Sequence, residues 1–256
     1  MTHVQDLFRL DGRIAVVSGA SRNIGLEISR ALASVNAHVV MVARDEDRLK
    51  AAAAEVVRTT GGSVSLRACD VSRGEDADAL VRWLTAEFGQ VDVLVNNAHA
   101  TGHRTAPVLE IAADDWAATL ATNLLGPYRL CAGLIPAMMS GRGGSIINML
   151  TGAAFRPSSR ALAYGASKAA LWSMTQYLAK ECAPKVRVNA LVPGFVQSDT
   201  GGPAGADLLP RYLPEIALGR VGRPEEIAPA VVYMASDASS YMTGSIMWVN
   251  GGRPSS

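Results

Sequence analysis

The sequence predicts an α/β fold in which one doubly wound parallel sheet carries helices on both faces. Three observations predict it. Short apolar runs recur along the 256-residue chain, stretches with helical spacing separate them, and no linker or repeat interrupts the pattern. Each crossover is long enough for a helix, as parallel pairing of successive strands requires. We therefore expect a single domain over residues 1–256.

The strands are expected where successive residues are apolar, because a strand between two layers of helices is buried on both faces. Seven runs meet this description: 14–18, 38–43, 64–69, 91–96, 145–150, 186–192 and 245–249. The helices are expected where apolar residues recur every three or four positions: 26–35, 47–60, 75–89, 116–139, 170–183 and 224–236. A Gly- and Pro-rich stretch at about 199–218 lacks such spacing, and loops of this length commonly serve as lids over a binding site.

Composition and charge exclude several classes of protein. The chain has 49% hydrophobic residues, and its 24 Lys and Arg oppose 23 Asp and Glu, which argues against disorder, nucleic-acid binding and membrane-surface binding. No apolar run approaches the ~20 residues of a membrane span, and the amino terminus lacks the apolar core of a signal peptide. We expect a cytoplasmic protein in which Cys69, Cys131 and Cys182 are reduced core residues.

A glycine-rich turn follows the first predicted strand and leads directly into a helix. It comprises Gly19, Ser21, Arg22, Asn23, Ile24 and Gly25. Glycines at such a turn let the backbone approach a diphosphate, and the helix amino terminus supplies free N–H groups. The middle glycine of the usual pattern is replaced by Asn23, the residue type that, after glycine, best tolerates the left-handed conformation. The turn indicates a dinucleotide site of Rossmann type, although a plain tight turn is the alternative.

The end of the second predicted strand bears on which dinucleotide is used. An NAD site places a carboxylate there, whereas an NADP site places an arginine near the 2′-phosphate. This chain has Ala43 and then Arg44, with Arg22 inside the glycine turn, so NADP(H) is favoured over NAD(H). The alternative is that Arg44 is a surface residue paired with Asp45 or Asp47.

Tyr164 and Lys168 lie four residues apart, on one face of a predicted helix. A nearby cation favours the phenolate, so Lys168 should lower the pKa of Tyr164. A shift of ~2–3 units would make Tyr164 a proton donor to a carbonyl and an acceptor from an alcohol near neutral pH. By itself this spacing also occurs by chance in many helices.

With these motifs in order, the chain resembles the short-chain dehydrogenase/reductases, and the pattern is most similar to the 3-oxoacyl-carrier-protein reductase branch. The resemblance covers essentially the whole length. It rests on the glycine turn, Asp70-Val71, Asn96-Asn97-Ala98, Asn123, Tyr164 with Lys168, Pro193-Gly194 and the tail TGSIMWVNGG.

The resemblance implies roles for individual residues. Asp70 and Val71 would contact the adenine, and Asn97 and Ala98 the adenosine ribose. Lys168 would bind the nicotinamide ribose. A last group would hold the nicotinamide end: Pro193, Gly194, Val196 and Ser198. Asp70 could equally be an ordinary turn residue.

Two further residues complete the predicted catalytic group. Pro127 has no N–H for the carbonyl of Asn123, so a kink is expected there, and the family's water relay would use that open carbonyl. The alternative is a kinked core helix. The serine that polarises the substrate carbonyl in the family is replaced by Thr151, which keeps the hydroxyl but has a stiffer χ1.

Other features are less specific. His99 stands at a position where the family has glycine. His99 and His103 are spaced for one face of a helix, but no carboxylate or thiolate nearby completes a set of metal ligands, so we expect no metal site. Four residues flank the predicted catalytic group and either line a substrate pocket or are ordinary loop residues: Phe155, Arg156, Arg160 and Phe195. The lid residues Asp207, Arg211 and Glu215 leave the substrate open.

These observations predict an NADP-dependent oxidoreductase that moves a hydride between the nicotinamide and a small-molecule ketone or secondary alcohol. Two alternatives are a non-catalytic dinucleotide-binding protein and a lyase, dehalogenase or isomerase on the same scaffold. The helix with Tyr164 also carries several apolar residues, namely Leu171, Trp172, Met174, Tyr177 and Leu178, on more faces than one sheet covers. Members of the family commonly pair this helix across a two-fold axis. The resemblance and the apolar residues together predict a homotetramer, with a dimer as the alternative.

Overall fold

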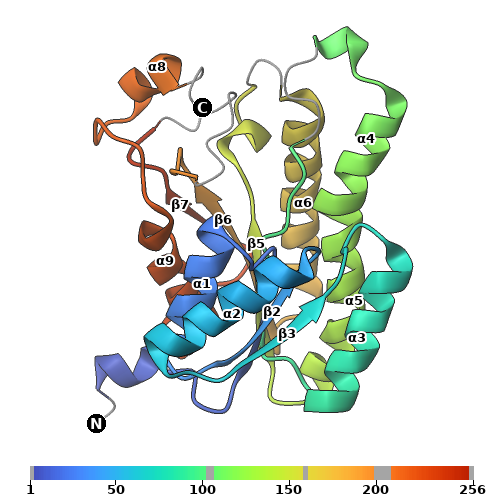
Figure 1. The fold of residues 1–256 in the computed structure, drawn as a ribbon, viewed down its shortest axis with the longest axis vertical. Coiled ribbons are helices and arrows are strands. Elements are labelled where there is room, and N and C mark those ends of the chain that lie inside the picture. Colours follow the sequence, from blue (N-terminus) through green and yellow to red (C-terminus); the bar gives the residue numbers. More distant parts are fainter. Residues whose placement is uncertain (1–2, 102–106, 158–160, 199–208, 254–256) are drawn as a thin grey trace.

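A computed structural model describes residues 3–101, 107–157, 161–198 and 209–253. Within them, seven parallel strands form one sheet in the order β3-β2-β1-β4-β5-β6-β7 (Figure 1). The strands are β1 (Ile14–Ser18), β2 (His38–Ala43), β3 (Val64–Ala68), β4 (Val93–Asn96), β5 (Gly144–Met149), β6 (Val186–Pro193) and β7 (Ile246–Val249). Each coincides with a predicted apolar run, so the predicted fold class is confirmed.

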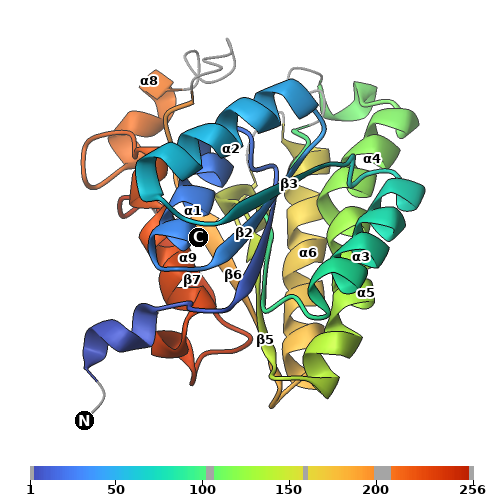
Figure 2. The same cartoon turned by 60° about the horizontal axis from the view of Figure 1, so that its bottom comes forward.

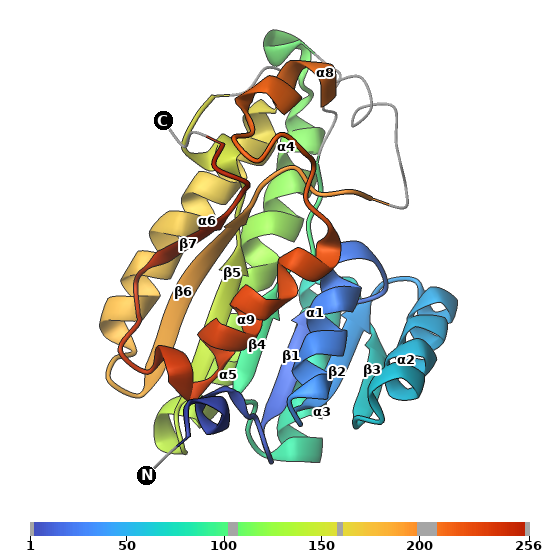
Figure 3. The same cartoon turned by 90° about the vertical axis from the view of Figure 1, so that its left-hand side faces the viewer.

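Helices cover both faces of the sheet. One face carries α1 (Asn23–Ser34), α2 (Glu46–Thr60) and α9 (Ala228–Ala235), and the other carries α3 (Gly74–Phe88), α5 (Gly126–Ser140) and α6 (Leu162–Glu181) (Figures 2 and 3). Their apolar stripes meet the sheet in two large buried clusters. Ile28 of α1 and Leu49 of α2 belong to the first cluster, and Leu80 of α3 and Leu134 of α5 to the second.

The edge strands depart from the expected burial on both faces. The inner strands are almost fully buried, but Arg67 and Ala68 of β3 are exposed, and every residue of β7 is only half-buried. An edge strand has a neighbour on one side only, so its covering layer ends there. The expectation was therefore wrong for these two strands.

The long helix expected at 116–139 consists of three consecutive pieces. These are α4 (Ala113–Leu120), a π-helical turn η3 (Ala121–Leu125) and α5. The amide of Gly126 donates to the carbonyl oxygen of Ala121, five residues back, which is the π pattern. The irregularity expected from Pro127 is thus present as a π turn around Asn123.

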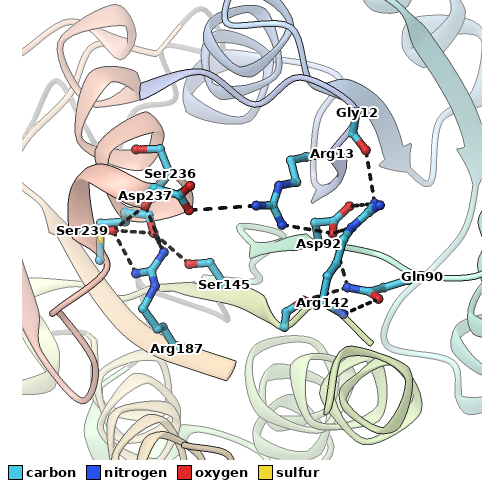
Figure 4. A network of polar contacts seen from close by, with 12 residues as sticks. Gly12, Arg13, Gln90, Asp92, Arg142, Ser145, Arg187, Ser236, Asp237 and Ser239 are labelled. Carbon is cyan, nitrogen blue, oxygen red and sulfur yellow. Dashed lines mark hydrogen bonds and ion pairs between the residues drawn. The ribbon is translucent and has the colours of Figure 1, made fainter. Parts of the chain in front are cut away.

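Arginine networks hold the amino edge of the sheet, opposite the edge where ligands bind in this fold class (Figure 4). Asp92 is 2% exposed, accepts a bidentate pair of hydrogen bonds from Arg142, and accepts a third from the amide of Ile14 at 2.8 Å. On β6, Arg187 donates to the carbonyl oxygens of Met234 and Ser236 at 2.9 and 3.2 Å. These contacts satisfy buried charges and anchor the start of four strands.

Two sequence expectations remain to be placed. The cysteines are buried and free, as predicted. Part of the predicted lid, residues 199–208, lies outside the described residues, and the remainder contains α8 (Leu209–Tyr212) and η5 (Leu213–Glu215). No helix in the described part of the chain is long and apolar enough to cross a membrane.

Candidate active site

The glycine turn lies where the strand order reverses, between β1 and β4 at the carboxyl edge of the sheet. Gly19 and Asn23 adopt left-handed φ values of 66° and 50°, so asparagine does accommodate the conformation expected at its position. A Cβ on Gly25 would come within 2.1 Å of the Gly19 carbonyl oxygen. This close turn at the amino terminus of α1 fits the diphosphate of a dinucleotide.

Ser18 and Asn97 join β1 to β4 beside this turn. Asn97 Nδ2 donates to the carbonyl oxygens of Ser18 and Gly19 at 2.9 and 3.1 Å, and the Ser18 hydroxyl accepts from the amides of Asn97 and Ala98 at 3.0 and 3.1 Å. The Asn97 amide therefore holds the turn in place. Contact of Asn97 and Ala98 with a ribose stays a prediction.

The region predicted to hold the adenine end of the cofactor contains the two predicted arginines, Arg22 and Arg44. Arg22 is exposed, with an extended backbone just before α1, and Arg44 is 76% exposed. Arg44 is 3.8 Å from Asp70, so its ion pair joins two predicted cofactor residues and differs from the Asp45 or Asp47 pair considered above. Asp70 Oδ1 also accepts from the amide and hydroxyl of Ser72, which is the turn role considered for it. Val71 is 5% exposed and packs in the core.

Lys168 is the most unusual buried side chain of the site. It is 1% exposed, and its Nζ donates to the carbonyl oxygen of Met149, the last residue of β5, at 2.8 Å. Burial lowers the pKa of Lys168 to about 7. Lys168, which the sequence predicts to be a cation beside Tyr164, therefore has a pKa at which it can gain and lose a proton near neutral pH.

Asn123 joins the loop after β4 to α6. Its Oδ1 accepts from the amide of Ala100, and its Nδ2 donates to the Ala100 carbonyl oxygen, both at 2.8 Å. Nδ2 also donates to Ser167 Oγ at 2.9 Å, and Ser167 Oγ donates to the carbonyl oxygen of Tyr164 at 2.8 Å. The side chain thereby ties α6 near Tyr164 to the end of β4, from its place in the π turn.

Thr151 begins the short helix η4 (Gly152–Ala154) after β5. Its Oγ1 accepts from the amide of Ala153 at 3.4 Å. A Cβ on Gly165 would lie 2.6 Å from the Ala153 carbonyl oxygen, so this glycine lets α6 approach the turn. Sequence reasoning overlooked Gly165, although a glycine inside a helical pattern commonly marks close packing.

His99 faces the predicted catalytic tyrosine. Their ring centroids are 6.3 Å apart, and His99 Nδ1 is 3.3 Å from the Asn97 carbonyl oxygen. The residue that stands where the family has glycine therefore lies beside the ring of Tyr164. His103 lies outside the described residues, and no group of three potential metal ligands occurs within the described ranges.

The segment after β6 is held on several sides. The Gly194 amide donates to the Val249 carbonyl oxygen at 2.9 Å, and Val196 forms a bridge with Gly222. A Cβ on Gly194 would lie 2.6 Å from the Asn250 Cα, which explains the need for glycine there. Ser198 accepts a hydrogen bond from Asn23 Nδ2 at 3.2 Å.

Two residues that the sequence analysis did not single out, Arg253 and Tyr212, connect the described part of the predicted lid to this edge. Arg253 lies with its guanidinium carbon 4.3 Å from the Tyr212 ring centroid and donates to Glu215 at 3.0 Å. Arg156 donates to the same carboxylate at 3.2 Å. The Phe195 ring packs 4.8 Å from that of Tyr212. No local sequence pattern predicts the contacts of Arg253, because its partners lie about 40 residues or more before it in the chain.

The residues predicted to line a substrate pocket fall into two groups. Phe155 packs against Trp172 and Trp248 at centroid distances of 6.4 and 5.1 Å, so it serves ordinary packing, whereas Phe195 and Arg156 meet the lid. Arg160 and Asp207 lie outside the described residues, as does the side chain of Arg211.

Comparison with known proteins finds a matching family model and similar enzymes. A family model described as enoyl-(acyl carrier protein) reductase matches residues 19–253. The chain is 36% identical over 244 residues to a 3-oxoacyl-[acyl-carrier-protein] reductase of Chlamydia muridarum, covering 95% of this chain and 98% of that one. It is 36% identical over 263 residues to a D-threitol dehydrogenase of Mycolicibacterium smegmatis, covering 98% of each.

A solved structure shares the whole fold. The gluconate 5-dehydrogenase of Burkholderia cenocepacia, in complex with NADP and tartrate, superposes with a TM-score of 0.89 at 29% identity. The match covers 99% of this chain and 100% of that one.

Proposed function

This chain belongs to the short-chain dehydrogenase/reductase family, and from that premise we propose that it is an NADP-dependent oxidoreductase acting on a small-molecule ketone or secondary alcohol. The observation that carries the proposal is the placement of Lys168. A lysine that is 1% exposed costs folding free energy, and this one lies one helical turn from Tyr164, with its Nζ at the end of β5. A buried base one helical turn from a phenol can exchange a proton with it, directly or through a water.

The cofactor supplies the hydride when bound, and the chain supplies the proton. We assign Tyr164 as the general acid in reduction and the general base in oxidation. Lys168, with its pKa lowered to about 7, takes up and releases the proton that Tyr164 exchanges and binds the nicotinamide ribose. Thr151 donates its hydroxyl hydrogen to the substrate oxygen, because its Oγ1 accepts from Ala153 and keeps its own hydrogen for donation.

Asn123 has two roles in this proposal. Its side chain positions α6 through Ser167, as the hydrogen bonds above require. Its main-chain carbonyl, in the π turn, holds a water that relays protons from Lys168.

The cofactor assignment depends on charge. Arg22 and Arg44 are exposed beside the adenine end of the site, where a 2′-phosphate would lie. The gluconate 5-dehydrogenase that shares this fold was solved with NADP, which agrees with the assignment. The remaining adenine and nicotinamide contacts are proposed for the residues named from the family resemblance.

The test is the rate of NADPH oxidation, with NADH in parallel, over a panel of 3-oxoacyl thioesters, keto-sugars, cyclic ketones and aromatic ketones. Turnover that prefers NADPH and falls at least ~10²-fold in Tyr164→Phe is the expected result. Tyr241→Phe is the matched control, because Tyr241 is fully exposed and belongs neither to the predicted site nor to the proposed interface. Saturable NADPH binding without turnover on any ketone would favour a non-catalytic dinucleotide-binding protein.

The assembly is proposed as a cytoplasmic homotetramer. The layer formed by the end of η3, by α5 and by α6 exposes several large apolar side chains: Leu125, Tyr128, Met139, Leu162 and Tyr177. Exposed apolar surface on two adjacent helices is typical of a two-fold interface. Light scattering should give four times the 26.8 kDa chain mass, and a monomer at micromolar concentration would contradict it.

A further inference from the structure

His99 gives the loop after β4 a large side chain at a position where the family has glycine. The backbone does not require glycine here, because among the described non-glycine residues only Asn23 and Asn36 have a left-handed φ. The imidazole is therefore added without backbone strain. In this chain a ring occupies the space beside the predicted catalytic tyrosine that a glycine would leave open.

The segment that carries His99 is anchored on both sides. The two residues before it donate through their amides to Ser18 Oγ at 3.0 and 3.1 Å. The residue after it, Ala100, is bound at its amide and at its carbonyl oxygen by the side chain of Asn123, at 2.8 Å in each case. A residue between such neighbours has little freedom to move, so the ring is presented from a rigid piece of backbone.

The orientation of the imidazole is also restrained. Its Nδ1 is 3.3 Å from the carbonyl oxygen of Asn97, and since a carbonyl oxygen only accepts, Nδ1 donates this hydrogen bond. The ring centroid lies 6.3 Å from that of Tyr164, with the two planes tilted by 52°. Tyr164 is half-buried and His99 is exposed, so the pair lies where the site meets the surface.

The position of the reacting carbonyl follows from the role assigned to Tyr164. A carbonyl oxygen that receives its proton lies about 2.7 Å from the phenol oxygen. The carbonyl carbon bears two substituents, which extend from there in different directions. Aromatic rings with centroids about 4.5–7 Å apart are in contact, so a substituent directed toward the loop after β4 meets the imidazole within a short distance.

We propose that His99 is a specificity-determining residue that bounds the pocket for the smaller of the two substituents on the substrate carbonyl. The substrate class is then a ketone, or the corresponding secondary alcohol, with one short arm. A longer arm would overlap the imidazole, and the anchored segment does not give way. The inference rests on the proposed function, because it requires that Tyr164 serves the reacting carbonyl. His99 acts through its shape, and no further hydrogen bond of its ring is needed.

The test uses the ketone that the full-length chain reduces fastest in the panel above, with homologues whose smaller arm is longer by one and by two carbons. The kcat/KM of each ketone is measured at saturating NADPH for the natural chain, His99→Ala and His99→Phe. His99→Phe keeps a ring without its nitrogens, so it separates shape from hydrogen bonding. His3→Ala is the control for loss of an exposed histidine, because His3 lies in the amino-terminal segment. Thermal melting verifies that each variant is folded.

In the natural chain, kcat/KM should fall at least ~10-fold for the first added carbon, within the range that one methylene commonly contributes to discrimination. His99→Ala should reduce that fall to about 3-fold or less, because the wall is removed. The ratio of the two enantiomers of the alcohol product should move toward one in His99→Ala, since a wider pocket accepts both orientations of the ketone. His99→Phe and His3→Ala should discriminate as the natural chain does.

Three results would overturn the inference while leaving the proposed function intact. In the first, the natural chain accepts the longer arms without loss. In the second, folded His99→Ala discriminates as the natural chain does, or loses turnover with every homologue. In the third, His99→Phe loses discrimination as fully as His99→Ala, so that the ring nitrogens decide and not the size of the ring. A folded natural chain that reduces no ketone of the panel would instead overturn the proposed function and this inference together.

Discussion

Lys168 Nζ donates a 2.8 Å hydrogen bond to the carbonyl oxygen of Met149, and this contact joins the middle of the site to the end of β5. It gives a buried ammonium one main-chain partner, which compensates only in part for the loss of water. The pKa of Lys168 falls from 10.5 to about 7 for that reason. Function and stability should therefore oppose each other at this residue.

Lys168→Met should stabilise the free protein by about 1–3 kcal/mol at pH 7 while abolishing turnover, because it replaces a buried charge by an apolar chain of similar length. Thermal melting and NADPH oxidation measure the two effects. The pH dependence has a definite sign. Between about pH 7 and 10.5 the unfolded chain holds a proton that folded Lys168 has released, so the stability of the natural chain rises with pH.

The advantage of Lys168→Met should therefore shrink as pH increases through that window and remain constant below it. Lys180→Met, a change at an exposed position on the same helix, is the control and should show no such trend. A constant difference in Tm from pH 7 to pH 10 would contradict the lowered pKa.

Thr151 should act through its hydroxyl. Thr151→Ser is expected to retain turnover, whereas Thr151→Ala should lose about 10²-fold in kcat, as removal of one oxyanion-type donor commonly does. Steady-state kinetics with NADPH and an accepted ketone measure both. Equal turnover of the two variants would refute the role.

Cofactor preference should depend on the two exposed arginines. Arg22→Ala and Arg44→Ala should each lower kcat/KM for NADPH about 10- to 100-fold and leave NADH nearly unaffected, because each removes a charge-assisted contact to the 2′-phosphate. Arg58→Ala, a change in the last turn of α2, is the control for lost surface charge. Parallel losses with NADH and NADPH would show that the arginines do not recognise this phosphate.

Arg253 should restrain the described part of the lid. Arg253→Met removes both the bond to Glu215 and the stacking on Tyr212, so amide hydrogen exchange in residues 209–216 should accelerate about 5- to 30-fold. Mass spectrometry of peptides from this segment measures the change. Arg223→Met is the control, since Arg223 pairs with Glu225 instead. Unchanged exchange would mean that the lid is held by its apolar contacts alone.

Much of the fold was predictable because its determinants are local. An apolar run such as that of β2 predicts a strand buried on both faces, and the helical spacing between successive runs predicts a helix as each crossover. The turn geometry at Asn23 was predictable for the same reason, since φ depends on the residue itself.

What the sequence determined by itself was the order of strands and helices, and it predicted which residues at the carboxyl ends of the strands form the site. The tertiary structure alone decided how far the edge strands are exposed, that the helix passes Asn123 as a π turn, and that burial lowers the pKa of Lys168. It also decided the bonds of Asn23 to Ser198 and of Arg253 to Glu215. Such contacts join residues distant along the chain, so they exist only once packing has brought their elements together.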